Sequence, residues 1–228
     1  MSLLNFDSGV TLVGGGEPGA VDLQQALEFA PNLIAADGGA NALEHDRPLA
    51  IIGDLDSLKN REHWERRGVA VHHIQDQNTT DLEKCLELID APFFLALGFL
   101  GGRLDHHLAA CHALIKSRAK PVLRIGIEDV CIHCPAQFEL NLPIGTRLSL
   151  FPLAPVAATS HGLRWELAGA GLLAGEKIST SNEVAGPVRI ETDGPGLLLM
   201  VPAQFLGSVV SALCRSDVPA RTHTTPTR

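Results

Sequence analysis

The most informative stretch of the sequence is Leu49-Ala50-Ile51-Ile52-Gly53-Asp54-Leu55-Asp56-Ser57, in which an apolar run leads into two carboxylates. Short apolar runs are typical of strands buried in a parallel sheet, and open α/β sheets bind ligands in the crevice beyond the carboxyl ends of these strands. Carboxylates at positions i and i+2 of such a crevice suit Mg²⁺, which commonly accompanies a phosphate-bearing substrate. Asp54 and Asp56 therefore predict chemistry on a nucleotide.

Apolar runs alternate with segments of helical period on both sides of this stretch, as far as about residue 127. The expected strands are Val10–Val13, Leu33–Ala36, Ala50–Ile52, Val69–Ile74, Pro92–Leu97 and Val122–Ile125. The expected helices are Val21–Phe29, Ala40–Glu44, Arg61–Arg67, Asp81–Ile89 and Leu104–Ser117. This alternation is the signature of a parallel sheet with flanking helices. We predict a Rossmann-like, nucleotide-binding catalytic α/β domain over residues 1–127.

Short segments with alternating apolar and polar residues follow, separated by turn residues. They are Phe138–Leu142, Leu148–Leu150, Leu163–Leu167, Val188–Ile190 and Leu197–Val201. This pattern predicts an all-β sandwich over residues 128–215, in which Trp165 has the spacing of an inward-facing core residue. Residues 216–228 are rich in Thr and Pro and are expected to form a flexible tail.

The composition argues against some classes of partner. With 228 residues, 45% of them hydrophobic, the chain can bury a full core. A net charge of −8 lacks the excess of Lys and Arg that marks nucleic-acid-binding proteins. The first residues contain no basic leader, and no apolar run approaches the ~20 residues of a membrane span. We therefore expect a cytoplasmic protein that binds neither nucleic acid nor membranes.

The cysteines do not indicate a disulfide framework, because their number, five, is odd. Cys131 and Cys134 form a C-x-x-C pair, yet no second cysteine pair or suitably spaced histidine pair completes a zinc site. The simpler interpretation is a strand whose alternate residues point inward.

Two glycine-rich loops precede the acidic stretch. Gly14–Gly19 follows a strand and satisfies G-x-G-x-x-G, which fits a dinucleotide fingerprint with Asp37 as the ribose-binding acid. Glycine-rich turns of this kind also occur for steric reasons alone. The segment Asp37–Asn41 allows backbone amides to approach a phosphate or nucleotide closely, although a plain turn is equally compatible with Asp37 and Asn41 taken alone.

A further loop, Gly98–His107, brings glycines, a guanidinium and a carboxylate together. Arg103 is suited to bidentate phosphate binding, whereas an exposed surface arginine is the commoner case. Asp105 stands beside it. His106 and His107 have no partner at metal-ligand spacing and are expected to serve as packing or polar lining.

The loops that follow successive strands of a doubly wound sheet gather along one edge, so acids far apart in the sequence are expected to share one crevice. Asp81, at the start of a helical stretch, is either one of these acids or only a helix N-cap. The residues expected at this edge are Asp37, Asp54, Asp56, Asp81, Arg103 and Asp105. Clustered carboxylates repel a polyphosphate unless a cation neutralises them, which predicts a complex of Mg²⁺ and a nucleotide as the occupant.

The motifs together resemble those of the thiamine pyrophosphokinase family. They are Asp37–Asn41, Gly53–Ser57, Gln75–Asp81 with Lys84, Gly101–His106 and Ser179–Asn182. The resemblance runs in the family's order from about residue 10 to residue 202. Leu55 departs from it by standing where an aromatic residue is frequent. The acidic loop before Thr80 is slightly longer than in many members, which leaves the role of Asp76 open.

The resemblance implies an ATP-dependent transferase that moves a pyrophosphoryl group from ATP to the hydroxyl of thiamine, giving thiamine diphosphate and AMP. It implies Mg²⁺ as cofactor, held by Asp54, Asp56 and Asp81, with Arg103 on the phosphates and Asp105 orienting or deprotonating the attacking hydroxyl. The nucleotide-binding residues implied are Gly15, Asp37, Gly38, Asn41, Thr80, Gly102 and Arg103. The thiamine-binding residues implied are Ser179, Ser181 and Asn182, for which a polar turn is the alternative. It also implies a homodimer with the site at the subunit interface.

Alternatives remain open at this point. A pyrophosphokinase for another hydroxymethyl heterocycle, such as a pterin, has the same acidic cleft with a different acceptor site. An NAD-dependent oxidoreductase uses Gly14–Gly19 for a dinucleotide, and a haloacid-dehalogenase-type phosphatase uses Asp54 and Asp56 as its nucleophile pair. A sensor that binds nucleotide without turnover is the non-enzymatic alternative.

Overall fold

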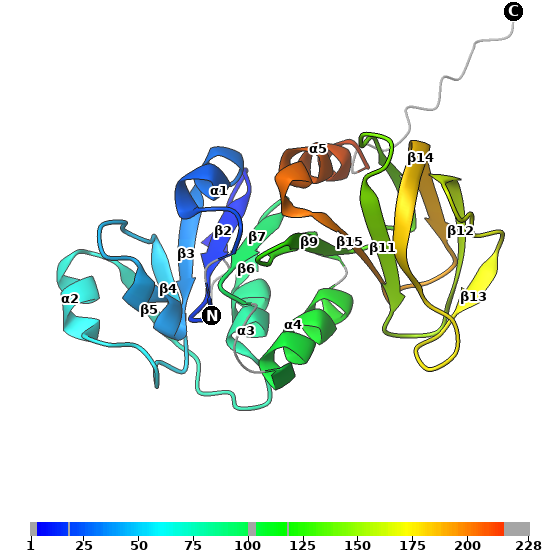
Figure 1. The fold of residues 1–228 in the computed structure, drawn as a ribbon. Coiled ribbons are helices and arrows are strands. Elements are labelled where there is room, and N and C mark those ends of the chain that lie inside the picture. The colour runs from blue at the N-terminus through cyan, green and yellow to red at the C-terminus, as the bar shows by residue number, and fades with distance from the viewer. Residues whose placement is uncertain (1–3, 18, 100–103, 118, 217–228) are drawn as a thin grey trace, which may run out of the picture.

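The computed structural model describes residues 4–17, 19–99, 104–117 and 119–216 (Figure 1). It contains an N-terminal parallel α/β sheet with helices and a C-terminal antiparallel β region, which confirms the predicted fold class. In the described part of the chain, no helix combines the length and the apolar character that crossing a membrane requires.

The N-terminal half is organised around a parallel sheet. Its strands, in chain order, are β2 (Val10–Val13), β3 (Asn32–Ala36), β4 (Ala50–Gly53), β5 (Ala70–His73), β7 (Phe94–Leu97) and β8 (Val122–Ile125), and a separate short pair joins β1 (Leu4–Asn5) to β6 (Ile89–Asp90). Side by side, the strands run in the order β8, β7, β2, β3, β4, β5, and all these pairs are parallel. The order reverses beside β2, and a reversal of this kind opens a crevice at the carboxyl ends of the strands.

Helices cover both faces of this sheet. They are α1 (Leu23–Phe29), α2 (Arg61–Arg66), α3 (Asp81–Leu88), α4 (Leu104–Lys116) and α5 (Leu206–Ser216), with 3₁₀ turns η1 (Asp37–Ala42) and η2 (Ala203–Phe205). Figure 1 shows α3 and α4 on one face and α1 and α5 on the other. Alternate strand residues explain this, since Phe94 and Ala96 pack with α3 and α4 whereas Leu95 and Leu97 pack with α5.

The C-terminal strands are antiparallel. They are β9 (Asp129–His133), β10 (Gln137–Leu140), β11 (Arg147–Pro152), β12 (Val156–Leu163), β13 (Ala170–Leu172), β14 (Ser179–Thr192) and β15 (Leu197–Pro202). The long strand β14 pairs with β11 near its start and with β10 and β12 further on. The sheet also continues without a break from β8 through β9, β15 and β11. One hydrophobic core therefore extends from Leu95 in the first half to Phe138 and Val184 in the second.

Three local expectations differ from the structure. The helix expected at Ala40–Glu44 is the 3₁₀ turn η1, which starts earlier, at Asp37. The strand expected over Leu163–Leu167 is wrong, because β12 ends at Leu163. Helix α5 was not expected inside a region predicted to be all β, and it contains Ser216, which was assigned to the tail. The remaining tail, residues 217–228, lies outside the described residues.

The C-x-x-C pair does not form a joint site. Both thiols are free and buried, but Cys131 packs in the core beneath α3 and α4 whereas Cys134 packs in the core that includes α5. Burial raises the pKa of each thiol to about 12, so both remain protonated at neutral pH. This arrangement supports a packing role.

Candidate functional site

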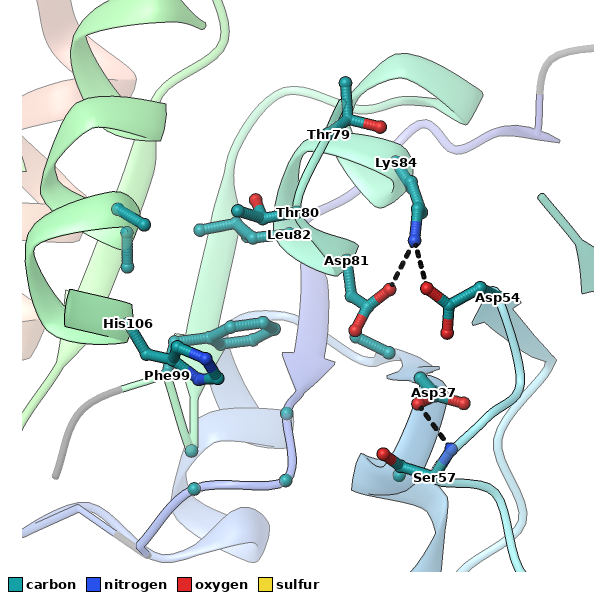
Figure 2. Close-up of a pocket in the computed structure, with 18 of the residues that line it drawn as sticks. Asp37, Asp54, Ser57, Thr79, Thr80, Asp81, Leu82, Lys84, Phe99 and His106 are labelled. Carbon is teal, nitrogen blue, oxygen red and sulfur yellow. Dashed lines mark hydrogen bonds and ion pairs between the residues drawn. The ribbon is translucent and has the colours of Figure 1, made fainter. Parts of the chain in front are cut away.

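A cavity of about 590 Å³ lies at the carboxyl edge of the parallel sheet, where the loops after β2, β3, β4 and β7 meet the first turn of α3. Figure 2 shows the side chains around it. The lining residues from these loops and helices are Gly14–Gly16, Ala36–Gly38, Asn41, Asp54, Ser57, Thr79–Leu82, Lys84, Gly98, Phe99, His106, Ala109 and Ala110. The crevice predicted from the strand pattern is therefore present, and we call this cavity the cleft.

Asp37 is a buried acid in the lining of the cleft. Its side chain is 3% exposed, and its backbone has a φ of 42°, which is uncommon for a residue with a Cβ. One carboxylate oxygen accepts a hydrogen bond of 3.2 Å from the amide of Ser57, while Oδ1 is buried without a hydrogen-bond partner. Gly53 is required opposite it, because a Cβ at Gly53 stands 2.6 Å from the Cβ of Asp37.

Carboxylate oxygens from Asp37, Asp54 and Asp56 lie within 4.8 Å of one another. Adjacent strands place them together, since β3 and β4 are paired up to Ala36 and Ile52. The unsatisfied Oδ1 of Asp37 supplies a reason for a ligand here, because a buried polar atom without a partner is costly. A set of hard oxygen donors with one unsatisfied atom fits a divalent cation such as Mg²⁺.

Lys84 places a cation inside the cleft. Its Nζ lies 3.0 Å from Asp54 Oδ2 and 3.0 Å from Asp81 Oδ1, and its side chain is only 2% exposed (Figure 2). Burial opposes the charged form of Lys84, but its bonds to the two carboxylates outweigh this and raise its pKa. The ammonium is therefore charged at neutral pH.

The two carboxylates bound to Lys84 differ in environment. For Asp54, burial raises the pKa, but hydrogen bonds from Lys84 and from the amide of Asp56 prevail and lower it. For Asp81, burial is the larger effect and raises the pKa despite the bond from Lys84. The pKa of Asp37 is also raised, by burial and then by the neighbouring charge of Asp81. The cleft thus concentrates more negative charge than its one described lysine balances.

The first turn of α3 is built by a capping box. Thr80 is the N-cap, its hydroxyl accepts from the amide of Glu83, and Glu83 accepts from the amide of Thr80. Asp81 is therefore the first helical residue, and the N-cap alternative for Asp81 is wrong. Because Lys84 follows three residues later, both side chains lie on the same face of the helix and point toward Asp54.

Glycines form one wall of the cleft. A Cβ on Gly14 stands 2.7 Å from the carbonyl oxygen of Gly98, and Gly98 itself has a φ of 71°. Gly14 and Gly98 are thus buried against each other, and the exposed part of this wall is formed by Gly15 and Gly16. The dinucleotide fingerprint is not reproduced, because α1 begins only at Leu23, beyond Gly19, and leaves no helix N-terminus at the glycine turn.

The structure brings together most of the predicted nucleotide-site residues. Those that line the cleft are Gly15, Asp37, Gly38, Asn41, Asp54, Thr80 and Asp81. Asp56 belongs to the oxygen cluster beside it. Asn41 also holds the wall, since it donates to the carbonyl of Ser57 and accepts from the amide of Lys59.

Other predicted residues are placed differently. Asp105 is exposed and is not among the lining residues, although the next residue, His106, is. Gly102 and Arg103 lie outside the described residues. Lys84 was noted in the sequence only as part of a motif, and its spacing of three residues from Asp81 is the signal from which its ion pair was predictable.

The residues that the resemblance assigns to thiamine binding are on β14 in the C-terminal half. They are Ser179, Ser181 and Asn182. Asn182 is 3% exposed, and its side-chain amide accepts from the amide of Trp165 at 3.1 Å and donates to the carbonyl of Trp165 at 2.7 Å. The expectation that Trp165 is a core residue is wrong, because its side chain is 56% exposed. Asn182 therefore fixes the backbone of Trp165, whose indole is exposed at the surface.

The segment Ser179–Asn182 is far from the cleft of its own chain. Along the sheet, β14 is separated from β2 by β11, β15, β9, β8 and β7. At about 4.8 Å between neighbouring strands, this path is roughly 29 Å long. Ser179, Ser181 and Asn182 do not line the cleft.

Comparisons with known proteins agree with this arrangement. The family model described as "Thiamin pyrophosphokinase, catalytic domain" matches residues 23–125, and "Thiamin pyrophosphokinase, vitamin B1 binding domain" matches residues 130–197. Thiamine pyrophosphokinase 1 of Oryza sativa subsp. japonica is 32% identical over 214 residues, covering 75% of this chain and 81% of that protein. Thiamin pyrophosphokinase 1 of Caenorhabditis elegans is 30% identical and covers 74% of this chain and 79% of its own length.

Solved structures show the same fold. Thiamin pyrophosphokinase from Candida albicans superposes with a TM-score of 0.70 at 17% identity, covering 89% of this chain and 93% of that one. Thiamine pyrophosphokinase from Bacillus subtilis gives a TM-score of 0.69 at 21% identity, covering 85% of this chain and 98% of that one.

Proposed function

Because the chain belongs to the thiamine pyrophosphokinase family, we propose that its cleft binds ATP with Mg²⁺ and delivers the pyrophosphoryl group to thiamine. The enzyme is a thiamine pyrophosphokinase, which transfers this group from ATP to the hydroxyl of thiamine and releases AMP. The observation that supports the site assignment most directly is the oxygen cluster of Asp37, Asp54 and Asp56 at the glycine-walled cleft.

Asp54 and Asp56 are proposed as the main ligands of Mg²⁺, with Asp37 completing the set through its unsatisfied oxygen. When bound, Mg²⁺ supplies positive charge against the phosphate oxygens. Asp81, assigned to the metal on sequence grounds, pairs with Lys84 and is proposed to orient the same triphosphate. The exposed glycines Gly15 and Gly16, which line the cleft, leave room for phosphates along the glycine wall.

Lys84 is proposed to hold Asp54 and Asp81 in place when the cleft is empty. Replacing it with methionine removes the only ammonium within ion-pair distance of these carboxylates among the described residues. Because the acids are partly exposed, we expect a loss of about 1–2 kcal/mol in unfolding free energy without Mg²⁺. This corresponds to a drop in Tm of roughly 2–8 °C. The measurement is thermal unfolding of Lys84→Met and wild type with and without Mg²⁺.

The Mg²⁺ dependence separates this role from simple packing. Lys84→Met should gain more in Tm from Mg²⁺ than the wild type does, since the ion replaces the missing cation. Lys116→Met is the matched control. Lys116, on α4, forms an ion pair of 2.8 Å with Glu83, which lies on the same helix as Lys84 but outside the cleft. Equal gains in the wild type and in Lys84→Met contradict the assignment.

Arg103 is proposed to contact the phosphates, with Gly102 beside it, and Asp105 to accept the proton of the attacking thiamine hydroxyl. The support for Asp105 is its place in the first turn of α4, next to His106, which lines the cleft. The reaction then depends on aligning the hydroxyl with the β-phosphorus and on neutralising charge that develops on the phosphate oxygens.

We propose that the thiamine site is formed by Ser179, Ser181, Asn182 and Trp165. Supporting this is the exposed side chain of Trp165, whose backbone Asn182 holds by two hydrogen bonds and whose ring centre lies 5.0 Å from the guanidinium carbon of Arg164. The path of roughly 29 Å along the sheet separates this segment from the cleft of its own chain. We therefore propose a homodimer in which the β region of one subunit completes the cleft of the other.

Truncating Trp165 should affect thiamine and not ATP. An indole stacked on the aminopyrimidine ring contributes about 1–2 kcal/mol, so Trp165→Ala should raise the KM for thiamine roughly tenfold. The KM for MgATP should change less than about twofold. Steady-state kinetics with each substrate varied gives both values. Ile144→Ala, which removes another exposed apolar side chain of the β region, is the control, and a tenfold rise in that variant also points to a general defect.

A cytoplasmic location is proposed because all the cysteines are free in the structure, as expected in a reducing compartment.

The function is tested with purified protein, MgATP and thiamine, by measuring AMP and thiamine diphosphate together. Equal amounts of both products are expected. Replacing thiamine with a hydroxymethylpterin tests the alternative acceptor, and turnover with the pterin alone overturns the acceptor assignment.

A further inference from the structure

Arg124 is a buried cation that the reaction described above does not use. Arg124 lies on β8 and is only 2% exposed. Its partners in the sheet register are Ala96 on β7 and Cys131 on β9. Among the described residues, no carboxylate forms an ion pair with it, and its Nε has no hydrogen-bond partner. Burying a guanidinium in this way is costly, so its remaining contacts are of interest.

Those contacts go to one residue of α4. Arg124 Nη1 donates to the carbonyl oxygen of His107 at 3.0 Å, and Nη2 lies 3.3 Å from His107 Nε2. A guanidinium has no acceptor, so Nε2 must accept and the ring proton is on Nδ1. Burial, and then the charge of Arg124, lower the pKa of His107, which favours this neutral acceptor form.

The part of α4 that Arg124 contacts has little other support. The buried residues of this helix begin at Ala110 and continue through Leu114, whereas Leu104 is 72% exposed and Leu108 is 56% exposed. The other end of the helix is fixed separately, by the pair between Lys116 and Glu83. The hydrogen bonds from Arg124 to His107 join the beginning of α4 to the sheet.

We propose that Arg124 is a positioning residue that fixes the N-terminal turns of α4 against the sheet and thereby sets the position of Asp105 and of the next residue, His106, which lines the cleft. This inference rests on the proposed function, in which Asp105 acts on the thiamine hydroxyl. Among the contacts described for α4, those of Arg124 lie on the side of the reacting groups, whereas the pair between Lys116 and Glu83 lies at the other end. A displacement of about 1 Å there is enough to lower a transfer rate by roughly 10²-fold.

The test compares Arg124→Met with Arg124→Lys in the full-length protein. Arg124→Met should lower kcat by roughly 10- to 100-fold with KM for MgATP changed less than about twofold, and Arg124→Lys, which keeps a donor for the His107 carbonyl, should recover at least about tenfold of this loss. Backbone amides of residues 108–111 should exchange hydrogen faster in Arg124→Met, with no such change in α3.

The matched control is Thr11→Val. Thr11 is also fully buried, and its hydroxyl donates to the carbonyl of Ala30 at 2.6 Å, so this variant removes an anchor of α1 instead of α4. It should lose stability and keep kcat. An Arg124→Met enzyme with wild-type kcat, or with unchanged exchange at residues 108–111, overturns the proposal. The exchange result does not depend on activity, so it stands apart from a failure of the wild type to make thiamine diphosphate, which overturns the proposed function.

Discussion

Replacing Asp54 with asparagine should reduce kcat with MgATP and thiamine by roughly 10³-fold, a loss of about 4 kcal/mol of transition-state stabilisation. Asp54 is the carboxylate shared by two features of the cleft, the oxygen cluster with Asp37 and Asp56 and the ion pair with Lys84. An amide keeps the shape of the side chain but removes its charge. The loss therefore falls on charge neutralisation at the triphosphate and not on packing.

Kinetics and metal titration together check this result. For Asp54→Asn, the Mg²⁺ concentration that gives half-maximal activity should rise at least about tenfold, because one of the proposed ligands has lost its charge. Asp46→Asn is the control, since Asp46 is a half-buried acid that pairs with Gln24 away from the cleft. If Asp54→Asn turns over at a rate near that of the wild type, Asp54 does not hold the metal.

The sequence was sufficient to predict the cleft because its walls follow from strand order. Asp37 and Asp54 each follow an apolar run, and adjacent parallel strands end at the same edge of a sheet, so the two acids had to be neighbours once the alternation of strands and helices was recognised. Asp81 joins them because it begins the helix that follows β5. Which acid bonds to which cation was not predictable, since it depends on distances of a few tenths of an ångström between loops.

The expectation for Trp165 failed for a physical reason. The apolar positions Leu163, Trp165 and Leu167 fit a strand, but Gly162 has a φ of 81° and the register of β12 against β14 shifts between His161 and Leu163. The chain leaves the strand there, and the amide of Asn182, distant in the sequence, holds it. Alternation within five residues carries no information about such a partner.

Helix α5 shows the opposite case, in which the signal was present in the sequence. Leu206, Val209, Val210 and Leu213 are buried and follow the i, i+3, i+4, i+7 spacing of an amphipathic helix. They pack in the core shared with Leu95 and Phe138. The strand-like pattern that precedes them favoured an all-β interpretation of the whole region, although the period had already changed after Pro202.

Asp105→Asn should lower kcat for thiamine by roughly 10²- to 10⁴-fold, the range expected when a general base is removed. Asp105 is an exposed acid in the first turn of α4, and its Oδ1 accepts from the amide of His106 at 3.0 Å. Asparagine keeps an oxygen for that amide but cannot take a proton from the hydroxyl of thiamine. The KM for MgATP should stay within about twofold of the wild-type value, because the metal cluster and Lys84 are intact.

A matched control separates proton transfer from a general effect of charge at the helix terminus. Glu62→Gln is the matched control, because Glu62 is an exposed acid in the first turn of α2, where its charge favours the helix dipole but touches no cleft residue. That control should keep full kcat. An Asp105→Asn enzyme whose kcat lies within threefold of the wild type excludes Asp105 as the base. The role then passes to another carboxylate of the cleft, of which Asp81 and Asp37 have pKa values raised by burial.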